Sequence, residues 1–305
     1  MRSILSKAKL GSQQGARPPA AVEVSPQGVL AAASPGPGQP PVYAFEPLPP
    51  GAIVPGIGEQ NLRAPEVVAN AIRAALGQVS PRTRAVTLVL PDTVVRVFFL
   101  DFDSLPAKAV EVLPILRFRL RKMIPFEVEH AGLSYQVLVE NKTECKVLAA
   151  VLPGPVLAEY EAAVREAGYE PGAVLPTSLA ALGAIDSTEP VLAANLSPLA
   201  LTTSITNSQD LLLYRTLDLP EDRGQRLEEV RRGIAVAAAF YEDKLQARPR
   251  SLHYAGDGGA GAFALWFDDP ELAIIELAPR PEIGAATALG GLSIAGVTGA
   301  LAGAN

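Results

Sequence analysis

The sequence has few of the residues that build metal centres and disulfides. Among its 305 residues are one cysteine, Cys145, and two histidines, His130 and His253. A single cysteine excludes a disulfide within the chain and fits a reducing compartment. Three such side chains are too few for a typical structural zinc site. We therefore expect a cytoplasmic protein with no metal centre.

Charge is also scarce, and positive charge is in the minority. Only 19% of the residues are charged, and the formal net charge is −6. An acidic chain has no general affinity for nucleic acid, so we expect no nucleic-acid partner. The 49% hydrophobic content is typical of a globular protein, and the length suits one two-lobed domain or two domains of ordinary size.

The residue patterns of common catalytic sites are missing as well. The acids Asp101, Asp103, Glu127 and Glu129 are candidates for acid–base chemistry, but their spacing also fits solvated charges and strand ends, which we favour. Neither histidine lies near a nucleophile motif in the sequence. We predict no catalytic residue and a protein that is not an enzyme.

The two ends of the chain differ in composition from the rest. Residues 1–15 carry basic side chains but no apolar core of signal-peptide length, and we predict a mobile cytosolic lead. Residues 284–305 are uncharged and rich in glycine and alanine. Their length is near that of a membrane span, yet large apolar residues are few. We favour a buried strand and helix with a loose tail over a transmembrane helix.

Hydrophobic periodicity predicts alternating strands and helices in the first half. Residues 34–58 are rich in proline and glycine, so we predict a loop there. Residues 85–90 and 94–100 read as a strand pair, and Ser104 as the N-cap of a helix over 105–123. The other predicted strands cover 20–24, 29–33, 133–139, 145–152 and 173–175, and the other predicted helices cover 65–76, 155–167 and 177–184.

The second half begins after a predicted boundary at 186–190. It has three predicted strands in a meander, a long helix, and a strand that runs into a glycine-rich turn. These elements cover 191–195, 199–205, 211–217, 225–245 and 251–254, and the turn covers 255–260.

The two halves open with similar segments. Ser25-Pro26 and Ser197-Pro198 each separate two predicted strands at the head of their half. A repeat so far apart favours two related lobes over a solenoid. We therefore expect two related lobes, each headed by one of these turns.

Four segments of the first half form a recognisable pattern: residues 88–92, 99–106, 115–127 and 133–138. The third is a basic and apolar helix ending in Pro125-Phe126, and the fourth contains the aromatic strand Tyr135-Gln136-Val137-Leu138. Together they resemble the PilM family of type IV pilus assembly proteins. The resemblance covers 20–184 well and 191–260 loosely. It implies an actin-like α/β fold of two lobes, each a mixed sheet with flanking helices.

Within that fold, the resemblance divides the chain into four parts. Residues 16–186 form the first lobe, 187–283 a shortened second lobe, and 1–15 and 284–305 the terminal segments. The family's second lobe normally carries an inserted subdomain, but only 218–224 separate the last meander strand from the long helix here. We therefore expect that subdomain to be missing.

Actin-like proteins bind ATP between their lobes, and the resemblance implies the same cleft here, with the two Ser-Pro turns facing each other across it. Its phosphate turns correspond to Glu23 and Ser25 in the first lobe and to Asn195 and Ser197 in the second, and its nucleoside-side turn to Gly256, Gly258 and Gly259. Both phosphate turns lack glycine and contain a proline, which has no N–H to donate to phosphate. We predict a vestigial nucleotide site with no cofactor.

The resemblance also implies a partner. A PilM-like protein would lie at the inner membrane, bind the cytosolic tail of a PilN-like single-span protein, and self-associate in a ring. The candidate partner-binding residues are Arg117, Arg121, Phe126 and Tyr135. We expect charge reversal at Arg117 and Arg121 to leave the fold intact. The alternatives are the cytoplasmic part of a type II secretion GspL-like protein and an actin-like ATPase.

Overall fold

The structure is a computed structural model that describes residues 17–36, 39–58, 60–141, 143–208, 210–267, 269–278, 289 and 291–302. The predicted lead 1–15 lies outside these residues, as does much of the predicted segment 284–305. Within the described part, no helix is long and apolar enough to cross a bilayer.

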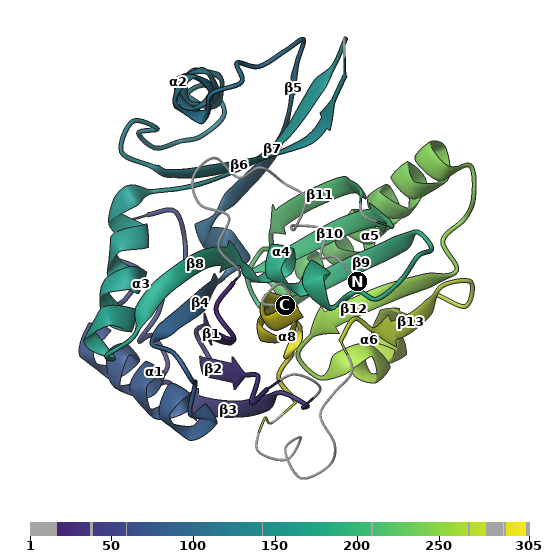
Figure 1. Ribbon diagram of the computed structural model, residues 1–305. Helices are drawn as coiled ribbons and strands as arrows, with labels where there is room; N and C mark the ends of the chain where they lie inside the picture. Colours follow the sequence, from purple (N-terminus) through teal and green to yellow (C-terminus); the bar gives the residue numbers. More distant parts are fainter. Residues whose placement is uncertain are drawn as a thin grey trace.

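The first lobe is built on a mixed five-stranded sheet in the order β3-β2-β1-β4-β8. Strand β1 pairs antiparallel with β2 and parallel with β4. Helices α1 and α3 pack on one face of this sheet, in one apolar core with β1 and β2 (Figure 1). The elements are β1 (Ala20–Val24), β2 (Gly28–Ala33), β3 (Val42–Pro47), α1 (Pro65–Val79), β4 (Ala85–Leu90), α3 (Gly154–Glu166), β8 (Glu170–Pro176) and α4 (Thr177–Ala181).

The second lobe repeats this topology. Its sheet has the order β11-β10-β9-β12-β13, again with an antiparallel meander followed by parallel strands. Its core lies between the sheet and the helices α5 and α6. The elements are β9 (Val191–Leu196), β10 (Ala200–Asn207), β11 (Asp210–Asp218), α5 (Arg223–Leu245), β12 (Ser251–Gly256), α6 (Gly259–Phe267), β13 (Ala273–Glu276) and α8 (Ala295–Ala302). The predicted two-lobed α/β class is confirmed.

The first lobe contains an extra unit between β4 and α3, which we call the inserted subdomain. It is a different unit from the second-lobe insertion that the sequence led us to expect to be missing. It is a three-stranded sheet of order β5-β7-β6 with α2 packed on one face, and it forms one end of the molecule (Figure 1). Its elements are β5 (Arg96–Phe102), α2 (Ala109–Leu120), β6 (Gly132–Glu140) and β7 (Cys145–Leu152). At the equivalent place in the second lobe, only 257–258 join β12 to α6, and the second-lobe insertion expected to be missing would lie between β11 and α5, where the structure has only 219–222.

Three predicted details were wrong. The expected strand pair does not form, because the 3₁₀ turn η1 (Asp92–Val94) leads the chain out of the first-lobe sheet and β5 joins the inserted sheet. Helix α2 begins after Lys108, not Ser104, since residues before proline disfavour helical backbone. The predicted loop 34–58 contains β3, an edge strand whose single neighbour is β2, and edge strands tolerate proline.

Helices α4 and α8 pack together where the lobes meet. A Cβ added to Gly299 in α8 would lie 2.1 Å from the Ala180 carbonyl oxygen in α4, so only glycine permits this approach. Helix α8 follows the second-lobe sheet in sequence but packs on β1 and β2 of the first lobe. In its described part, the segment predicted as buried is therefore a buried helix.

Candidate functional site

The two Ser-Pro turns lie on opposite walls of one cavity between the lobes. Ser25 and Pro26 line it from the β1–β2 turn, and Ser197 and Pro198 line it from the β9–β10 turn. The expectation that the two turns face each other across one cleft is confirmed. The cavity is also lined by Glu23, Asn195, Gly256, Asp257, Leu292 and Ser293.

The backbone amides of both turns are used within the turns themselves. Ser25 N donates to Gly28 O at 2.9 Å, and Gly28 N donates back to Ser25 O at 3.2 Å. In the other turn, Ser197 N donates to Ala200 O at 2.9 Å, and Ala200 N donates to Ser197 Oγ at 3.0 Å. A phosphate cradle needs several N–H groups aimed at one anion. In these turns the backbone N–H groups of Ser25, Gly28, Ser197 and Ala200 close the hairpins and do not point at a shared anion position.

Glu23 lies at the end of β1, buried beneath the first turn. Burial raises its pKa to about 8. Thr177 Oγ1 lies 3.0 Å from Glu23 Oε1 and also 3.0 Å from the Leu90 carbonyl oxygen. A hydroxyl has one proton, so Thr177 donates to only one of these two oxygens at a time. With a pKa of about 8, the Glu23 carboxyl group holds a proton at pH 7, unlike the acid that would orient a metal-bound water.

Asp92 is the second buried acid of the junction, and it links the lobes. Its carboxylate accepts bonds from Ser178 N at 3.0 Å and from the Ser178 hydroxyl in the first lobe. From the second lobe, Thr202 Oγ1 donates at 3.2 Å and Tyr214 OH at 3.3 Å. Burial raises the pKa of Asp92, and the four bonds oppose that shift. Sequence reasoning missed this residue, because its partners are 86 to 122 positions away.

The glycine-rich turn lies where β12 meets α6, on the second-lobe wall. Gly258 and Gly259 both have φ of 77°, a region that favours glycine. A Cβ at Gly256 would lie 2.3 Å from the Tyr254 hydroxyl. Gln27 Nε2 donates to Asp257 Oδ2 at 3.1 Å across the cleft. Of the residues predicted for the nucleotide site, five line the cavity and Gly258 and Gly259 do not; the five are Glu23, Ser25, Asn195, Ser197 and Gly256. The contact between Gln27 and Asp257 joins the two lobes at the same cavity.

The size and polarity of the cavity limit what it can hold. Its volume is about 90 Å³, whereas small-molecule pockets usually begin at about 300 Å³. Glu23 Oε2 and Asn195 Nδ2 are buried and have no hydrogen-bond partner among the described residues. No cluster of three histidine, cysteine or acidic side chains in the described residues could hold a metal ion. Space and polarity suit a few water molecules.

The four predicted partner-binding residues lie together in the inserted subdomain, but three of them support its structure. Arg117 donates to the Val128 carbonyl and, at 3.2 Å, to the Ala131 carbonyl. Phe126 and Tyr135 pack in the subdomain core. These contacts hold the loop between α2 and β6, so we now expect reversal of the Arg117 charge to destabilise the subdomain, unlike the expectation from the sequence.

Arg121 is the exposed member of the group. Its guanidinium pairs with Glu129, which lies in the loop between α2 and β6. The backbone N–H of Glu129 and then the Arg121 side chain lower the carboxyl pKa of Glu129. The Arg121 side chain is 62% exposed, so an acidic group of a partner can reach it and compete with Glu129.

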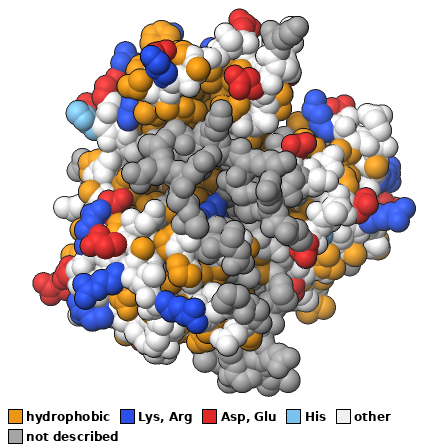
Figure 2. Space-filling model, viewed as in Figure 1, with side chains coloured by type: hydrophobic (Ala, Val, Ile, Leu, Met, Phe, Trp, Pro, Cys, Tyr) orange, Lys and Arg blue, Asp and Glu red, His pale blue; other side chains and the backbone are white. Residues whose placement is uncertain are grey.

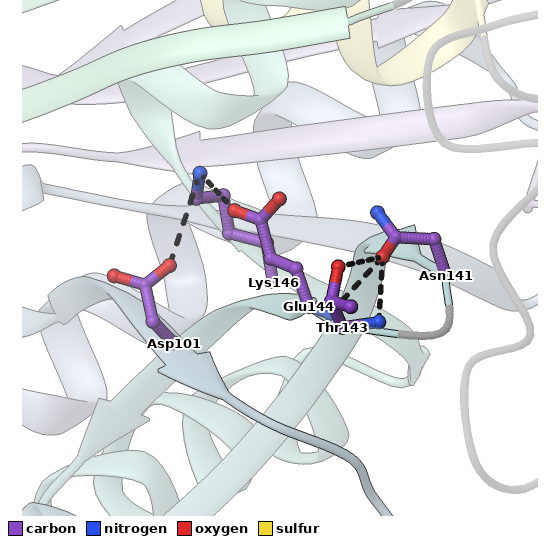
Figure 3. A network of polar contacts seen from close by, with 5 residues as sticks. All are labelled: Asp101, Asn141, Thr143, Glu144 and Lys146. Atoms are coloured by element: carbon purple, nitrogen blue, oxygen red, sulfur yellow. Dashed lines mark hydrogen bonds and ion pairs between the residues drawn. The ribbon is translucent and has the colours of Figure 1, made fainter.

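A polar network fixes the far end of the inserted sheet (Figure 3). Asn141 Oδ1 accepts bonds from Thr143 N at 2.9 Å and Glu144 N at 3.0 Å, which closes the β6–β7 turn. Lys146 then joins Glu144 at 2.8 Å to Asp101 of β5 at 3.9 Å. The network ties the turn to the outer strand β5 through Lys146 of the central strand β7.

Comparison with known proteins gives similarity in structure. The sequence matches no protein-family model and no curated protein sequence. The fold is similar to a solved PilM–PilN type IV pilus biogenesis complex, with a TM-score of 0.71, 19% identity, and coverage of 95% of this chain and 100% of that chain.

Two further solved structures have TM-scores of 0.51. One is the cytoplasmic domain of EpsL, an inner-membrane component of the Vibrio cholerae type II secretion system, at 14% identity with 88% of this chain and 92% of that chain covered. The other is a Bacteroides thetaiotaomicron protein with an actin-like ATPase fold and unknown function, at 10% identity with 90% and 95% covered. This chain therefore has the actin-like fold, as seen in proteins of pilus and secretion machinery.

Proposed function

We propose that the chain is a non-catalytic adaptor of a type IV pilus assembly machine. In this role it lies in the cytoplasm at the inner membrane and binds the cytosolic tail of a PilN-like single-span protein. The observation that carries the proposal is the match to the PilM–PilN complex, which extends over 95% of this chain and all of the other. That span includes the inserted subdomain as well as both lobes.

The geometry of the cleft supports a role without nucleotide turnover. Pro26 and Pro198 have no N–H, and the neighbouring amides close the hairpins. Glu23 is neutral at pH 7, and the cavity is far smaller than a nucleotide pocket. The lobes are instead joined by the protein's own side chains, through Asp92 and Gln27.

The inserted subdomain offers an edge at which a tail can bind. Strand β6 pairs with β7 on one side, and no described strand pairs with its other side. An extended tail can add to such an edge by backbone hydrogen bonds, with side chains giving selectivity. Arg121 would meet an acidic group of the tail, while Arg117, Phe126 and Tyr135 keep β6 and its preceding loop in place.

Capture of the tail tests the proposal directly. The probe is the cytosolic tail of the single-span inner-membrane protein encoded beside this chain, fused to a carrier. We expect the tail to co-purify with the chain in the absence of nucleotide, and Arg121→Glu to weaken the complex. The control is Arg223→Glu in the second lobe, which makes the same charge change at an exposed site. Failure of the wild-type chain to bind the tail contradicts the proposal.

A second candidate function is the cytoplasmic part of a GspL-like type II secretion protein. The similarity to the cytoplasmic domain of EpsL favours it. A tail from a secretion-system partner would then bind more tightly than a PilN-like tail. An actin-like ATPase is the third candidate. A micromolar dissociation constant for Mg²⁺–ATP in a calorimetric titration would support it over both adaptor functions.

A further inference from the structure

Helix α2 is apolar on both of its sides. Its inward side buries Val112, Leu116 and Leu120 in the core of the inserted subdomain. A surface helix normally presents polar residues on the opposite side, and a helix that is apolar all round is normally covered. The outward side of α2 is therefore a surface that requires an explanation.

The outward side carries an apolar strip at a spacing of four residues. Val110 is 72% exposed and Phe118 is 73% exposed, and the exposed Pro114 lies between them in sequence. Residues four apart lie on one face of a helix, so the three form a continuous strip. Met123 extends the exposed apolar surface just beyond the end of the helix.

Positive charge surrounds this strip. Residues 108–122 contain five cations and one acid in a chain whose net charge is −6. The single acid, Glu111, is paired with Lys108 at 3.8 Å, and Arg121 is paired with Glu129. Arg119 and Lys122 are exposed, with no ion pair to a described residue. Figure 2 shows hydrophobic and basic side chains side by side at this end of the molecule.

We propose that the outward face of α2 rests on the surface of an anionic lipid bilayer. Phe118 and Val110 enter the interface between head groups and acyl chains, and Arg119 and Lys122 meet lipid phosphates. Exposed large apolar side chains next to basic ones are the features of interfacial membrane helices. The helix lies at the extremity of the molecule, so a flat surface can approach it without meeting the lobes (Figure 1). The lipid contact goes beyond capture of a tail and is tested without the partner.

Vesicle co-sedimentation tests the contact with the full chain. Phosphatidylcholine vesicles containing about one-third phosphatidylglycerol should bind the wild-type chain, and pure phosphatidylcholine vesicles should bind it weakly. Each basic residue near an anionic surface contributes about fivefold in affinity, so Arg119→Glu with Lys122→Glu should weaken binding by about thirtyfold or more. Phe118→Ser with Val110→Ser should weaken it by at least about tenfold. Raised salt should weaken the wild-type interaction.

Matched variants on the second lobe serve as controls. Leu265→Ser removes an apolar side chain that is 87% exposed in α6, and Arg215→Glu with Arg223→Glu repeats the charge change at exposed sites. Both should bind vesicles as the wild type does. Unchanged melting temperatures show that the variants are folded.

Three results would overturn the proposal. The first is that the wild-type chain does not bind anionic vesicles. The second is that the second-lobe control variants lose as much vesicle binding as the α2 variants. The third is that light scattering without lipid detects concentration-dependent self-association that Phe118→Ser abolishes. The last result assigns the face to a second copy of the chain. Tail capture is a separate measurement: binding to vesicles without tail capture contradicts the adaptor function alone, and tail capture without vesicle binding contradicts the lipid contact alone.

Discussion

Asp92 of the first lobe and Tyr214 of the second lobe are joined by a hydrogen bond of 3.3 Å, in which the tyrosine hydroxyl donates to Asp92 Oδ1. The same carboxylate accepts from Thr202 Oγ1 at 3.2 Å. Asp92 is also the first residue of η1, the turn that leads into β5, the first strand of the inserted subdomain. One buried carboxylate thus connects both lobes at the base of the subdomain that we propose binds the partner.

Replacement of Asp92 should destabilise the chain. Asp92→Ala removes the buried acceptor that Ser178, Thr202 and Tyr214 share, so we expect the free energy of unfolding to fall by about 3 kcal/mol in urea titration. Asp92→Asn keeps one acceptor oxygen and should cost about half as much. The control is Asp218→Ala, which removes the exposed pair with Arg96. Equal effects of Asp92→Ala and Asp218→Ala would show that Asp92 does not hold the lobes together.

Glu23 should make stability depend on pH. Its folded-state pKa is raised to about 8, so the folded chain holds a proton that the unfolded chain releases above about pH 4.5. The free energy of unfolding should therefore fall by about 1.4 kcal/mol per pH unit between these values. Glu23→Gln should reduce this slope. A smaller pH dependence should remain, because the pKa of Asp92 is also raised in the folded chain. A variant with the wild-type slope would mean that Glu23 is ionised in the folded chain.

Arg117 and Arg121 should behave differently although they lie one helical turn apart. Arg117→Ala removes the donor to the carbonyls of Val128 and Ala131, and we expect a loss of about 2 kcal/mol in the free energy of unfolding. Arg121→Ala removes an exposed pair and should leave the melting temperature unchanged. Differential scanning fluorimetry compares the two. A melting curve of Arg117→Ala that overlies the wild type would contradict its structural role.

The contact between α4 and α8 should tolerate no added methyl group. Gly299→Ala places a Cβ against the backbone of Ala180, so we expect a loss of about 2 kcal/mol or more. Gly77 in α1 has no atom within 4 Å of an added Cβ. Gly77→Ala should therefore be neutral or stabilise the chain by about 0.5 to 1 kcal/mol. If both variants melt alike, the close helix contact does not form in solution.

Local patterns in the sequence predict most of the secondary structure. The second-lobe meander at 191–217 and the helix after it have the expected order and nearly the expected ends, because period-2 and period-3.6 patterns are unbroken there. The Ser-Pro echo predicts the facing turns. The strand partner of 94–100 was wrongly predicted, because pairing depends on where η1 directs the chain, and β5 pairs with β7 about fifty residues later.

The candidate site is predictable in part for the same reason. Glu23, Asn195 and the glycine-rich turn stand at positions that the family resemblance marks, and the fold brings them to one cleft. Asp92 gives no local signal, since its importance arises from Thr202 and Tyr214 in the other lobe. The sequence does not predict the structural role of Arg117 either. A helical pattern indicates the side of the helix on which a residue lies, but not the loop carbonyls to which its side chain donates.

The central claim is that the chain captures a partner tail without nucleotide. Calorimetric titration of the chain with the tail of the neighbouring single-span protein, in the presence and absence of Mg²⁺–ATP, tests it most directly. We predict the same affinity and stoichiometry for the tail in both conditions, and no heat of binding when ATP is titrated alone. Tail binding that requires ATP, or ATP binding in the micromolar range with no tail binding, would contradict the account.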